Sequence, residues 1–436
     1  MARHASDDGR PARWPYAVAA LAAAAAGAAV ALAWNGPTSG VGAPAGAAPT
    51  SATSGRSGSP AASPSPSPSP SPSASPAAFT LLAAGDLLTH NPVVRSAGGS
   101  QDPDFTPLLA GLDPWVQGAD LALCHLEVPI APKGTEPSGY PLFGAPAGLV
   151  RDLDEQGWDG CSTASNHSVD RGYDGVTATI RRLADAGMGY VGTSRSDAEQ
   201  EEPQRYTLTR EGREITVAHL AATYGLNGLP MPADAPWAVD LIDADRLVRQ
   251  AREAREDGAD VVVVSLHAGV EYTEVLTDQQ EDVVRRLARS GEVDLVIGHH
   301  AHVPQRIDRV GKGPDGEGMW VAYGLGNLLS NQSSACCDAR TSNGVLLSAT
   351  FVQDAPDEPT RVTDVTWTGT TVDIGGGHRV LALPDGLADP GATTLSAAEL
   401  DAREDRVAEA VGAVAPERQE PPEATGPPPE VLPRDD

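Results

Sequence analysis

Four short apolar runs of this chain end close to a residue type that binds metals or takes part in catalysis. Each run has the length and composition of a buried strand. The runs are residues 79–84, 261–264, 295–297 and 321–325, and the residues that follow them are Asp86, His267, His300 and Asn327. In an open α/β sheet, ligands gather at the carboxyl ends of the strands. The pattern therefore predicts loops that converge on one site.

Two further stretches carry the same residue types, namely His125-Leu126-Glu127 and Ser165-Asn166-His167. In addition, His300 and His302 lie two residues apart, so both imidazoles can reach one metal ion where an extended segment ends. Carboxylate oxygens, an amide and several imidazoles together suit a hydrolytic metal centre.

Taken singly, each motif also has a structural interpretation. Asp86 fits a helix or turn cap, Glu127 fits a surface salt bridge, and His267 fits a buried, hydrogen-bonded imidazole. The Asn166-His167 pair fits a simple turn. We interpret the motifs as one site because the whole set is far less expected by chance than any member of it.

The charge of the chain restricts its partners. The net charge is −28, and the part after residue 78 carries 27 basic and 57 acidic residues. Such a surface argues against nucleic acid or anionic lipid as a general partner of the folded part. An anionic substrate must therefore be held locally, most simply by bound cations.

The first 34 residues predict a targeting segment. Arg3, Arg10 and Arg13 precede an Ala-rich apolar run, residues 16–34, of about the length that crosses a bilayer. Positive charge before the run predicts a cytoplasmic stub, a single-pass anchor and a folded domain outside the cytoplasm. The alternative is a cleaved signal peptide, which would release a secreted protein.

Composition divides the rest of the chain. Residues 35–78 are rich in Ser and Pro and predict a disordered tether, because such a segment cannot bury an apolar core. Residues 79–383 predict the folded domain. Residues 384–436 are acidic and Pro-rich, and we expect this tail to be largely disordered, with one short helix at 397–411.

Within the domain, the candidate strands alternate with amphipathic helical patterns. These helical patterns are residues 148–156, 175–186, 244–256 and 278–290. The alternation predicts a mainly parallel sheet covered by helices. A hairpin-like pair at 205–209 and 214–221, and later strands at 344–352 and 361–367, extend this to a mixed, two-sheet core.

Four cysteines are too few for a disulfide scaffold. Cys124 and Cys161 lie at the ends of candidate neighbouring strands, so a disulfide and two buried thiols both remain open. Cys336 and Cys337 are adjacent in a Ser-rich loop. No cysteine spacing of a metal site is present.

The six motifs together resemble a known family. The stretches GDLL, HLEVPI, SNHSVDRGYDG, SLHAGVEY, GHHAHVPQ and YGLGNLL are similar, in this order, to those of the CapA family of bacterial capsule and poly-γ-glutamate synthesis proteins. The resemblance covers roughly residues 79–350. It implies an α/β fold, a metallophosphoesterase-like αββα sandwich of two mixed sheets flanked by helices.

The resemblance also implies a centre for two divalent cations, among which Mn, Fe, Zn and Mg are not distinguished. Glu127 would bridge the two ions. Asp86 and His302 would belong to one metal, and Asn166, His267 and His300 to the other. His167 would protonate the leaving oxygen or bind the phosphoryl group. Two such cations clamp a phosphoryl group and lower the pKa of a bound water.

The chain departs from the superfamily pattern in its first two motifs. Leu87 and Leu88 follow Asp86 where an Asp-x-His is usual, so the first metal loses an imidazole unless His90 supplies it. Glu127 stands where phosphoesterases have Asp. His125 stands where capsule relatives usually have Asn, and we interpret it as a group that hydrogen-bonds to a ligand from behind.

Several further residues are expected around the ligands. We interpret His299 as a supporting or surface residue and Asp170 as part of the turn into the next helix. The residues expected to line the cleft or orient the ligands are Glu271, Tyr272, Gln305 and Asn327.

The resemblance implies a membrane-anchored, outward-facing protein that acts in the synthesis or export of an anionic cell-surface polymer of the poly-γ-glutamate type. The expected partners are that polymer or a phosphate ester, a membrane synthase complex and the membrane itself, but not nucleic acid. Whether the protein is an enzyme stays open. The alternatives are a non-catalytic polymer-binding partner of the synthase, which the missing histidine favours, and a general extracellular metallophosphodiesterase.

Overall fold

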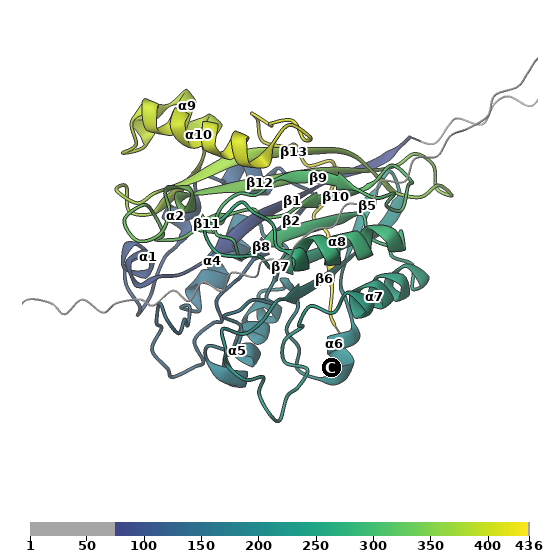
Figure 1. Ribbon diagram of the computed structural model, residues 1–436, viewed down its shortest axis with the longest axis horizontal. Coiled ribbons are helices and arrows are strands. Elements are labelled where there is room, and N and C mark those ends of the chain that lie inside the picture. The colour runs from purple at the N-terminus through teal and green to yellow at the C-terminus, as the bar shows by residue number, and fades with distance from the viewer. Residues whose placement is uncertain (1–74, 435–436) are drawn as a thin grey trace, which may run out of the picture. The chain divides into compact units, whose positions relative to one another are not determined.

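The computed structural model describes residues 75–434 (Figure 1). The predictions of a cytoplasmic stub, of an anchor and of most of the tether concern residues 1–74 and lie outside the described residues. The tether was predicted to extend to residue 78, but the first strand already begins at Ala77. Within residues 75–434, we find no helix with both the length and the apolar character needed to cross a bilayer.

The first of two sheets is mixed. Its order is β14-β13-β12-β1-β2-β3-β4, with β11 paired beside β1. Strands β1 to β4 run parallel, whereas β12, β13 and β14 are antiparallel to their neighbours. The strands are β1 (Ala77–Leu87), β2 (Leu121–His125), β3 (Gly160–Ser162), β4 (Gly189–Val191), β11 (Asn327–Leu329), β12 (Asn343–Gln353), β13 (Arg361–Asp373) and β14 (Arg379–Ala382).

The second sheet has the order β15-β5-β6-β7-β8-β10-β9. Its central strands β6, β7, β8 and β10 are parallel, and β5 and β6 form the predicted hairpin. The strands are β5 (Gln204–Arg210), β6 (Arg213–Thr223), β7 (Val261–His267), β8 (Leu295–His299), β9 (Ile307–Val310), β10 (Met319–Ala322) and β15 (Glu430–Leu432).

Helices cover the outer faces of both sheets. In Figure 1, α7 and α8 lie against the second sheet, and α9 and α10 lie beyond β12 and β13 of the first. The predicted αββα sandwich is therefore confirmed. The helices are α1 (Asn91–Ser96), α2 (Thr106–Leu109), α3 (Asp113–Gln117), α4 (Gly148–Gln156), α5 (Gly172–Asp185), α6 (Asp197–Glu201), α7 (Ala244–Glu256), α8 (Asp278–Ser290), α9 (Leu383–Ala388) and α10 (Ala397–Val411).

The central strands are buried on both faces, and this explains their continuous apolar runs. In β1, Phe79 and Leu81 pack toward the second sheet, and Leu82 packs in the other direction against the helices of the first sheet. In β7, Val263 joins the core between the sheets and Val264 the core under α7 and α8. Both sheets thus present their parallel strand ends at the same edge of the sandwich.

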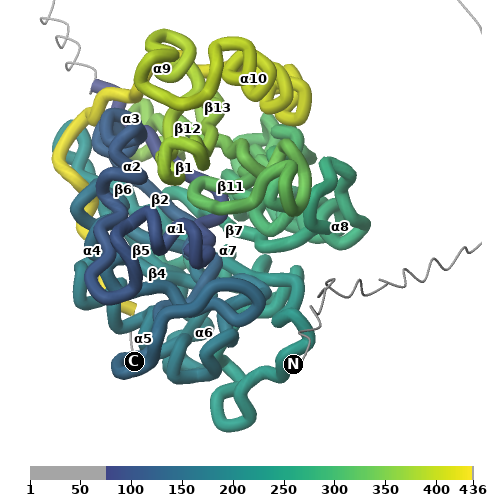
Figure 2. The backbone as a smooth tube through the Cα atoms, turned by 90° about the vertical axis from the view of Figure 1, so that its left-hand side faces the viewer, coloured from purple at the N-terminus to yellow at the C-terminus, as the bar shows by residue number. Residues whose placement is uncertain are grey.

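The prediction of a largely disordered tail is wrong for the described residues. Beyond α10, strand β15 pairs antiparallel with β5, and Figure 2 shows the terminal segment in yellow along the side of the molecule. Arg434 is buried, and its guanidinium donates to the carbonyls of Tyr190 and Thr193 and to the Ser194 hydroxyl. These long-range contacts offset the unfavourable composition, so residues 384–434 belong to the domain.

Both cysteine pairs are disulfides. Cys124 and Cys161 face each other on the neighbouring strands β2 and β3, with their Cα atoms 4.4 Å apart. Of the two alternatives for this pair, the structure therefore contains the bridge. Cys336 and Cys337 are joined to each other in the loop before β12.

Candidate metal centre

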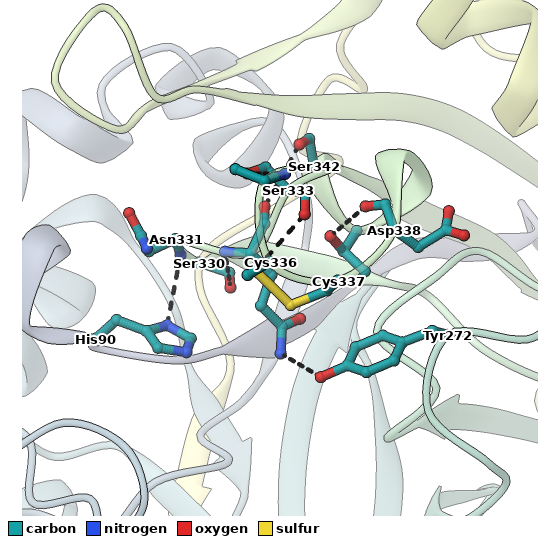
Figure 3. Close-up of a disulfide and its surroundings, with 12 residues drawn as sticks. His90, Tyr272, Ser330, Asn331, Ser333, Cys336, Cys337, Asp338 and Ser342 are labelled. Atoms are coloured by element: carbon teal, nitrogen blue, oxygen red, sulfur yellow. Dashed lines mark hydrogen bonds between the residues drawn. A yellow bond between two sulfur atoms is a disulfide. The ribbon is translucent and has the colours of Figure 1, made fainter. Parts of the chain in front are cut away.

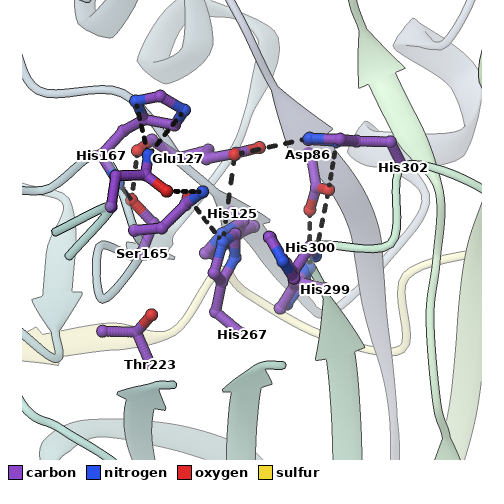
Figure 4. A network of polar contacts seen from close by, with 12 residues as sticks. Asp86, His125, Glu127, Ser165, His167, Thr223, His267, His299, His300 and His302 are labelled. Atoms are coloured by element: carbon purple, nitrogen blue, oxygen red, sulfur yellow. Dashed lines mark hydrogen bonds and ion pairs between the residues drawn. The ribbon is translucent and has the colours of Figure 1, made fainter. Parts of the chain in front are cut away.

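The predicted site residues come from both sheets. Asp86, near the end of β1, lies opposite His125 of β2 and Asn327 of β11 in the strand register. His267 ends β7 opposite His299, the last residue of β8. The parallel strands of the two sheets therefore bring these side chains to one place, where Figure 4 shows them facing one another.

Asp86 is fully buried among histidines. Its Oδ2 lies 3.1 Å from His302 Nδ1 and its Oδ1 3.3 Å from His299 Nδ1. The backbone N–H of His300 donates to Oδ2 at 3.2 Å. Burial raises the pKa of the carboxyl, but the hydrogen bonds to His299 and His302 outweigh it and hold the pKa well below its ordinary value. Asp86 is therefore an anion deep inside the protein.

Glu127, which follows β2 of the first sheet, lies between two histidines of the second sheet. Its Oε1 is 3.8 Å from His302 Nε2 and 3.9 Å from His267 Nε2. The carboxyl is fully buried, and neither of its oxygens has a hydrogen-bond partner among the described residues. Burial raises its pKa well above the ordinary value. A buried carboxyl without partners is costly unless something else compensates it.

His267 connects the amide motif to the second motif. Its Nε2 lies 2.9 Å from Asn166 Oδ1, and its Nδ1 lies 2.9 Å from His125 Nε2. The other nitrogen of His125 meets the Ser162 hydroxyl at 2.8 Å, and the ring stacks on His299 at 3.9 Å between centroids. His125 thus lies behind His267 and fixes the orientation of its ring.

His300 and His302 follow β8 in a tight loop. Both have left-handed backbones, with φ of 86° and 56°, which turn the two side chains back toward the strand ends. The His300 ring packs at 4.8 Å from His267 and 4.5 Å from Tyr224, between centroids. Strain of this kind in residues other than glycine is frequent at functional sites.

The histidines differ in charge. Burial lowers the pKa of His300 to about 3 and that of His267 well below its ordinary value, so both rings are neutral at pH 7. Burial also lowers the pKa of His302, but Glu127 and Asp86 outweigh it and raise this pKa to about 9. His302 therefore carries the proton that partly neutralises the two carboxyl groups.

The residues fit a divalent cation. Asp86, Glu127 and His302 place one ligand atom each within 4.8 Å of one another, and so do Asp86, His125 and His267. Glu127, whose two oxygens have no hydrogen-bond partner among the described residues, belongs to the first of these groups. Carboxylate and imidazole donors in this combination suit Zn, Mn, Fe or Mg. The Asn166 amide oxygen lies 2.9 Å from His267, and the His300 ring packs on the His267 ring, although His300 belongs to neither group.

His167 stands at the rim of this cluster and is held by Asp170. Its Nδ1 lies 2.7 Å from Asp170 Oδ2, which also accepts the Phe143 N–H at 2.7 Å. The other ring nitrogen lies 3.4 Å from the Asn227 amide. Asp170 does more than shape the turn into the next helix, because it fixes the orientation of the His167 ring.

The four outer residues occupy different positions. Glu271 is exposed and lines a cavity, and Tyr272 lies beside His302 with 6.0 Å between ring centroids. Asn327 Oδ1 lies 3.1 Å from His302 Nδ1. Gln305 instead bonds to Gln280 and to the Thr273 carbonyl, so it supports the loop that carries Glu271. It does not touch the cluster.

His90 and His299 differ in their relation to Asp86. His90 accepts a hydrogen bond from the Asn331 N–H, and its ring packs edge-on against Phe143. It lies in the cavity wall and makes no described contact with Asp86, so it does not supply the missing imidazole in this conformation. His299 is buried against Asp86, so of the two alternatives for this residue, supporting or surface, the structure shows the supporting one.

A cavity of about 640 Å³ opens beside the cluster. His167 and His302 contribute to its lining, together with loops that the sequence analysis did not single out. Among these are the segment around Phe143, the loop of Asn227 and the pair Cys336–Cys337. Loop residues of this kind carry no periodic pattern, so the sequence does not predict that these loops lie close together.

Together, the sandwich and the cluster define a protein of the metallophosphoesterase-like class. Residues 80–332 match the family described as bacterial capsule synthesis protein PGA_cap, and the chain belongs to this family. The match covers more than half of the chain. It confirms the family that the motifs indicate.

Two relatives extend this comparison. The chain is 28% identical over 187 residues to the capsule biosynthesis protein CapA of Bacillus anthracis, covering 42% of this chain and 43% of that protein. It is 27% identical over 184 residues to the PGA biosynthesis protein CapA of Bacillus subtilis, covering 42% and 45%. The chain thus matches less than half the length of these curated relatives.

Solved structures with a similar course of the chain share little sequence with it. One is the NAD nucleotidase of Haemophilus influenzae, with 12% identity and a TM-score of 0.45, covering 78% of this chain and 57% of that one. Another is the calcineurin-like phosphoesterase YfkN of Bacillus subtilis, with 12% identity and a TM-score of 0.42, covering 76% and 97%.

Proposed function

We propose that this protein is a metal-dependent phosphoesterase that acts outside the cytoplasm in making or exporting an anionic cell-surface polymer of the poly-γ-glutamate type. The polymer is proposed from the names of the relatives, which are a capsule and a PGA biosynthesis protein. The observation that carries the chemistry is the buried carboxyl of Glu127, which has no hydrogen-bond partner among the described residues and lies beside Asp86 inside a cluster of histidines.

In this proposal, Asp86, Glu127 and His302 would hold one cation, and Asn166, His267 and His300 would hold the other. When bound, divalent cations neutralise charge on a phosphoryl group and lower the pKa of an attacking water. Asp86 and Glu127 supply the negative charge that the fold has buried for this purpose. His125, bonded to Ser162, keeps Nε2 of His267 directed at Asn166.

His167 acts on the leaving group. Asp170 holds its Nδ1, so Nε2 is the nitrogen that meets the leaving oxygen and donates a proton to it. The Asn227 amide beside this nitrogen positions the group that leaves. Cleavage of a phosphate ester requires a proton donor beside the ligands of the cations. His167 at the rim of the cluster has this position.

The experiment compares hydrolysis and metal content. Full-length protein loaded with Mn²⁺ is assayed on a chromogenic phosphodiester, with manganese measured on the same samples. We expect His167→Ala to lose activity and keep its metal, and His300→Ala to lose both. Wild-type protein that binds Mn²⁺ without turnover would contradict the phosphoesterase proposal.

One observation favours a second candidate, a non-catalytic partner of a membrane synthase. Leu88 occupies the position where phosphoesterases place an imidazole, and it lines the cavity. A metal short of one ligand can still hold a carboxylate polymer without activating water. Tight binding of oligo-γ-glutamate by Mn²⁺-loaded protein without turnover is the outcome that supports this candidate.

Location outside the cytoplasm is part of the proposal and rests on the charge and length of residues 1–34. The test is addition of protease to intact protoplasts that express the full chain. An external domain is digested there without lysis. Digestion that requires lysis would place the domain on the cytoplasmic side.

A further inference from the structure

The cavity beside the metal cluster has walls of very different chemistry. His167 and His302, which lie at the metal cluster, belong to its lining. The lining also includes Tyr140, Leu142 and Phe143 from the loop before α4, Tyr272 from the loop after β7, and the Cys336–Cys337 pair from the segment between β11 and β12. Figure 3 shows Tyr272 facing the loop that carries this disulfide.

We propose that the cavity binds a phosphate ester with a single anionic centre and an uncharged ring with an apolar face as its leaving group. It does not bind an internal stretch of a polyanion. This inference rests on the proposed function of the metal cluster and specifies the substrate of that site. Three observations carry it.

The first observation is charge. No Lys or Arg belongs to the described residues that line the cavity, whereas Glu271 and Asp170 do. The nearby Arg340 is turned away, since it bonds to Glu274, to Asp338 and to the Tyr272 carbonyl. A ligand with further anionic groups would meet repulsion here and no cation except at the metal positions.

The second observation is apolar surface at the mouth. Tyr140 is 76% exposed and Leu142 48% exposed, although both are large apolar side chains. They flank Phe143, whose buried ring packs at 4.8 Å from His167 and 6.5 Å from Tyr140, between centroids. Exposed apolar groups at the rim of a cavity indicate a ligand-binding surface, and aromatic rings favour flat partners.

The third observation is the polar but uncharged set of donors and acceptors. The Asn227, Asn331 and Gln332 amides line the same cavity. Gln332 is fixed by its bonds to the Tyr272 hydroxyl at 3.3 Å and to the Asn327 amide at 2.9 Å. Amides around an apolar-walled cavity orient a neutral group without adding charge.

The test uses non-hydrolysable probes on the Mn²⁺-loaded full chain. Calorimetry measures the Kd of methylphosphonate, of phenylphosphonate and of a γ-glutamate hexamer. We expect phenylphosphonate to bind about tenfold more tightly than methylphosphonate, because its ring is buried against the aromatic wall. The hexamer is expected to bind no more tightly than methylphosphonate.

Variants separate the wall from the metals. Tyr140→Ala is expected to remove the preference for phenylphosphonate over methylphosphonate and to leave the Kd of methylphosphonate unchanged. Leu142→Ala is expected to reduce the same preference by a smaller amount. Leu241→Ala is the matched control, because Leu241 is similarly exposed, at 44%, but does not line the cavity. This control should keep the full preference.

The outcomes distinguish the two levels of the proposal. Equal affinity for the two phosphonates, or tighter binding of the hexamer, overturns the inference about the leaving group and leaves the metal centre standing. Failure of both phosphonates to bind in the presence of Mn²⁺ overturns the proposed function and this inference with it.

Discussion

At the scale of single residues, the centre is a balance of buried charge. Two carboxyl groups, Asp86 and Glu127, lie among histidines that are mostly neutral. His302, in contrast, is held protonated at pH 7, with a pKa raised to about 9 by its two acidic neighbours. A cation that binds here takes the place of this proton, because a metal ligand must be deprotonated.

This exchange predicts a pH dependence with a definite sign. The folded pKa of His302 lies above its ordinary value of 6.5, so its ion pairs stabilise the metal-free protein fully below that pH and are lost as pH rises through about 9. The affinity for Mn²⁺ should rise by up to about tenfold per pH unit across this window. Calorimetry at pH 6.5, 7.2 and 8 measures it. His302→Asn should flatten the dependence, and an affinity that is flat in the wild type would refute this account of His302.

Single residues also differ in whether their place in the site can be predicted from one sequence. Asp86, His267, His300 and Asn327 were found because each follows an apolar run of the sequence, and strand ends are predictable meeting places. The run before Asn327 was predicted as a strand over 321–325, but β10 ends at Ala322 and Asn327 begins β11 of the other sheet. The role of Asp170 was missed, because its bond to His167 depends on a local turn and not on spacing. The contact of His299 with Asp86 was not predicted for a similar reason, because it joins residues of two different sheets that are far apart in the sequence.

At the scale of elements, local sequence signals such as caps predict where a helix begins and ends. Helix α8 begins at the predicted residue because Thr277 and Gln280 form a reciprocal capping box, and it ends at Gly291 in the left-handed conformation. Strands β1, β7 and β8 were readable because burial on both faces leaves a continuous apolar run. The cavity-lining loops were not readable, since their conformations depend on contacts with distant parts of the domain.

The cap of α8 gives a prediction about stability. Thr277→Ala removes the side-chain acceptor for the Gln280 N–H and should lower the free energy of unfolding by about 1 kcal/mol. Thr273→Ala, in the preceding loop and outside the helix, is the control. Urea unfolding of the metal-free protein measures both, and equal losses in the two variants would show that the cap does not set the start of this helix.

At the scale of the whole molecule, the terminal segment closes the sandwich. Composition predicted disorder for residues 384–436, because Pro and acidic residues bury little apolar surface. Instead, β15 extends the second sheet, and Thr425 bonds to Asp120 next to β2. These contacts join positions far apart in the chain, and a pattern read along the sequence does not contain them.

Arg434 is the strongest of these terminal contacts. Its buried guanidinium donates to several carbonyls, so Arg434→Ala should lower the free energy of unfolding by about 2–3 kcal/mol by leaving buried acceptors unpaired. Arg361→Ala is the control, because that side chain forms an ion pair with Asp354 on the surface, where solvent screens the interaction. A loss as small as that of the control would mean that the terminal segment contributes little to the fold.

The account as a whole depends on Asp86 and Glu127 being buried together in order to hold a divalent cation. The most direct measurement is the amount of Mn²⁺ bound at equilibrium by the full chain and by Glu127→Gln, determined by elemental analysis after dialysis. We predict at least one ion per chain in the wild type and at least about a hundredfold weaker binding in the variant, with the metal-free fold of the variant at least as stable because Gln replaces a buried carboxyl whose oxygens have no hydrogen-bond partner within the described part of the chain. Wild-type protein that retains no more manganese than the variant would contradict the account.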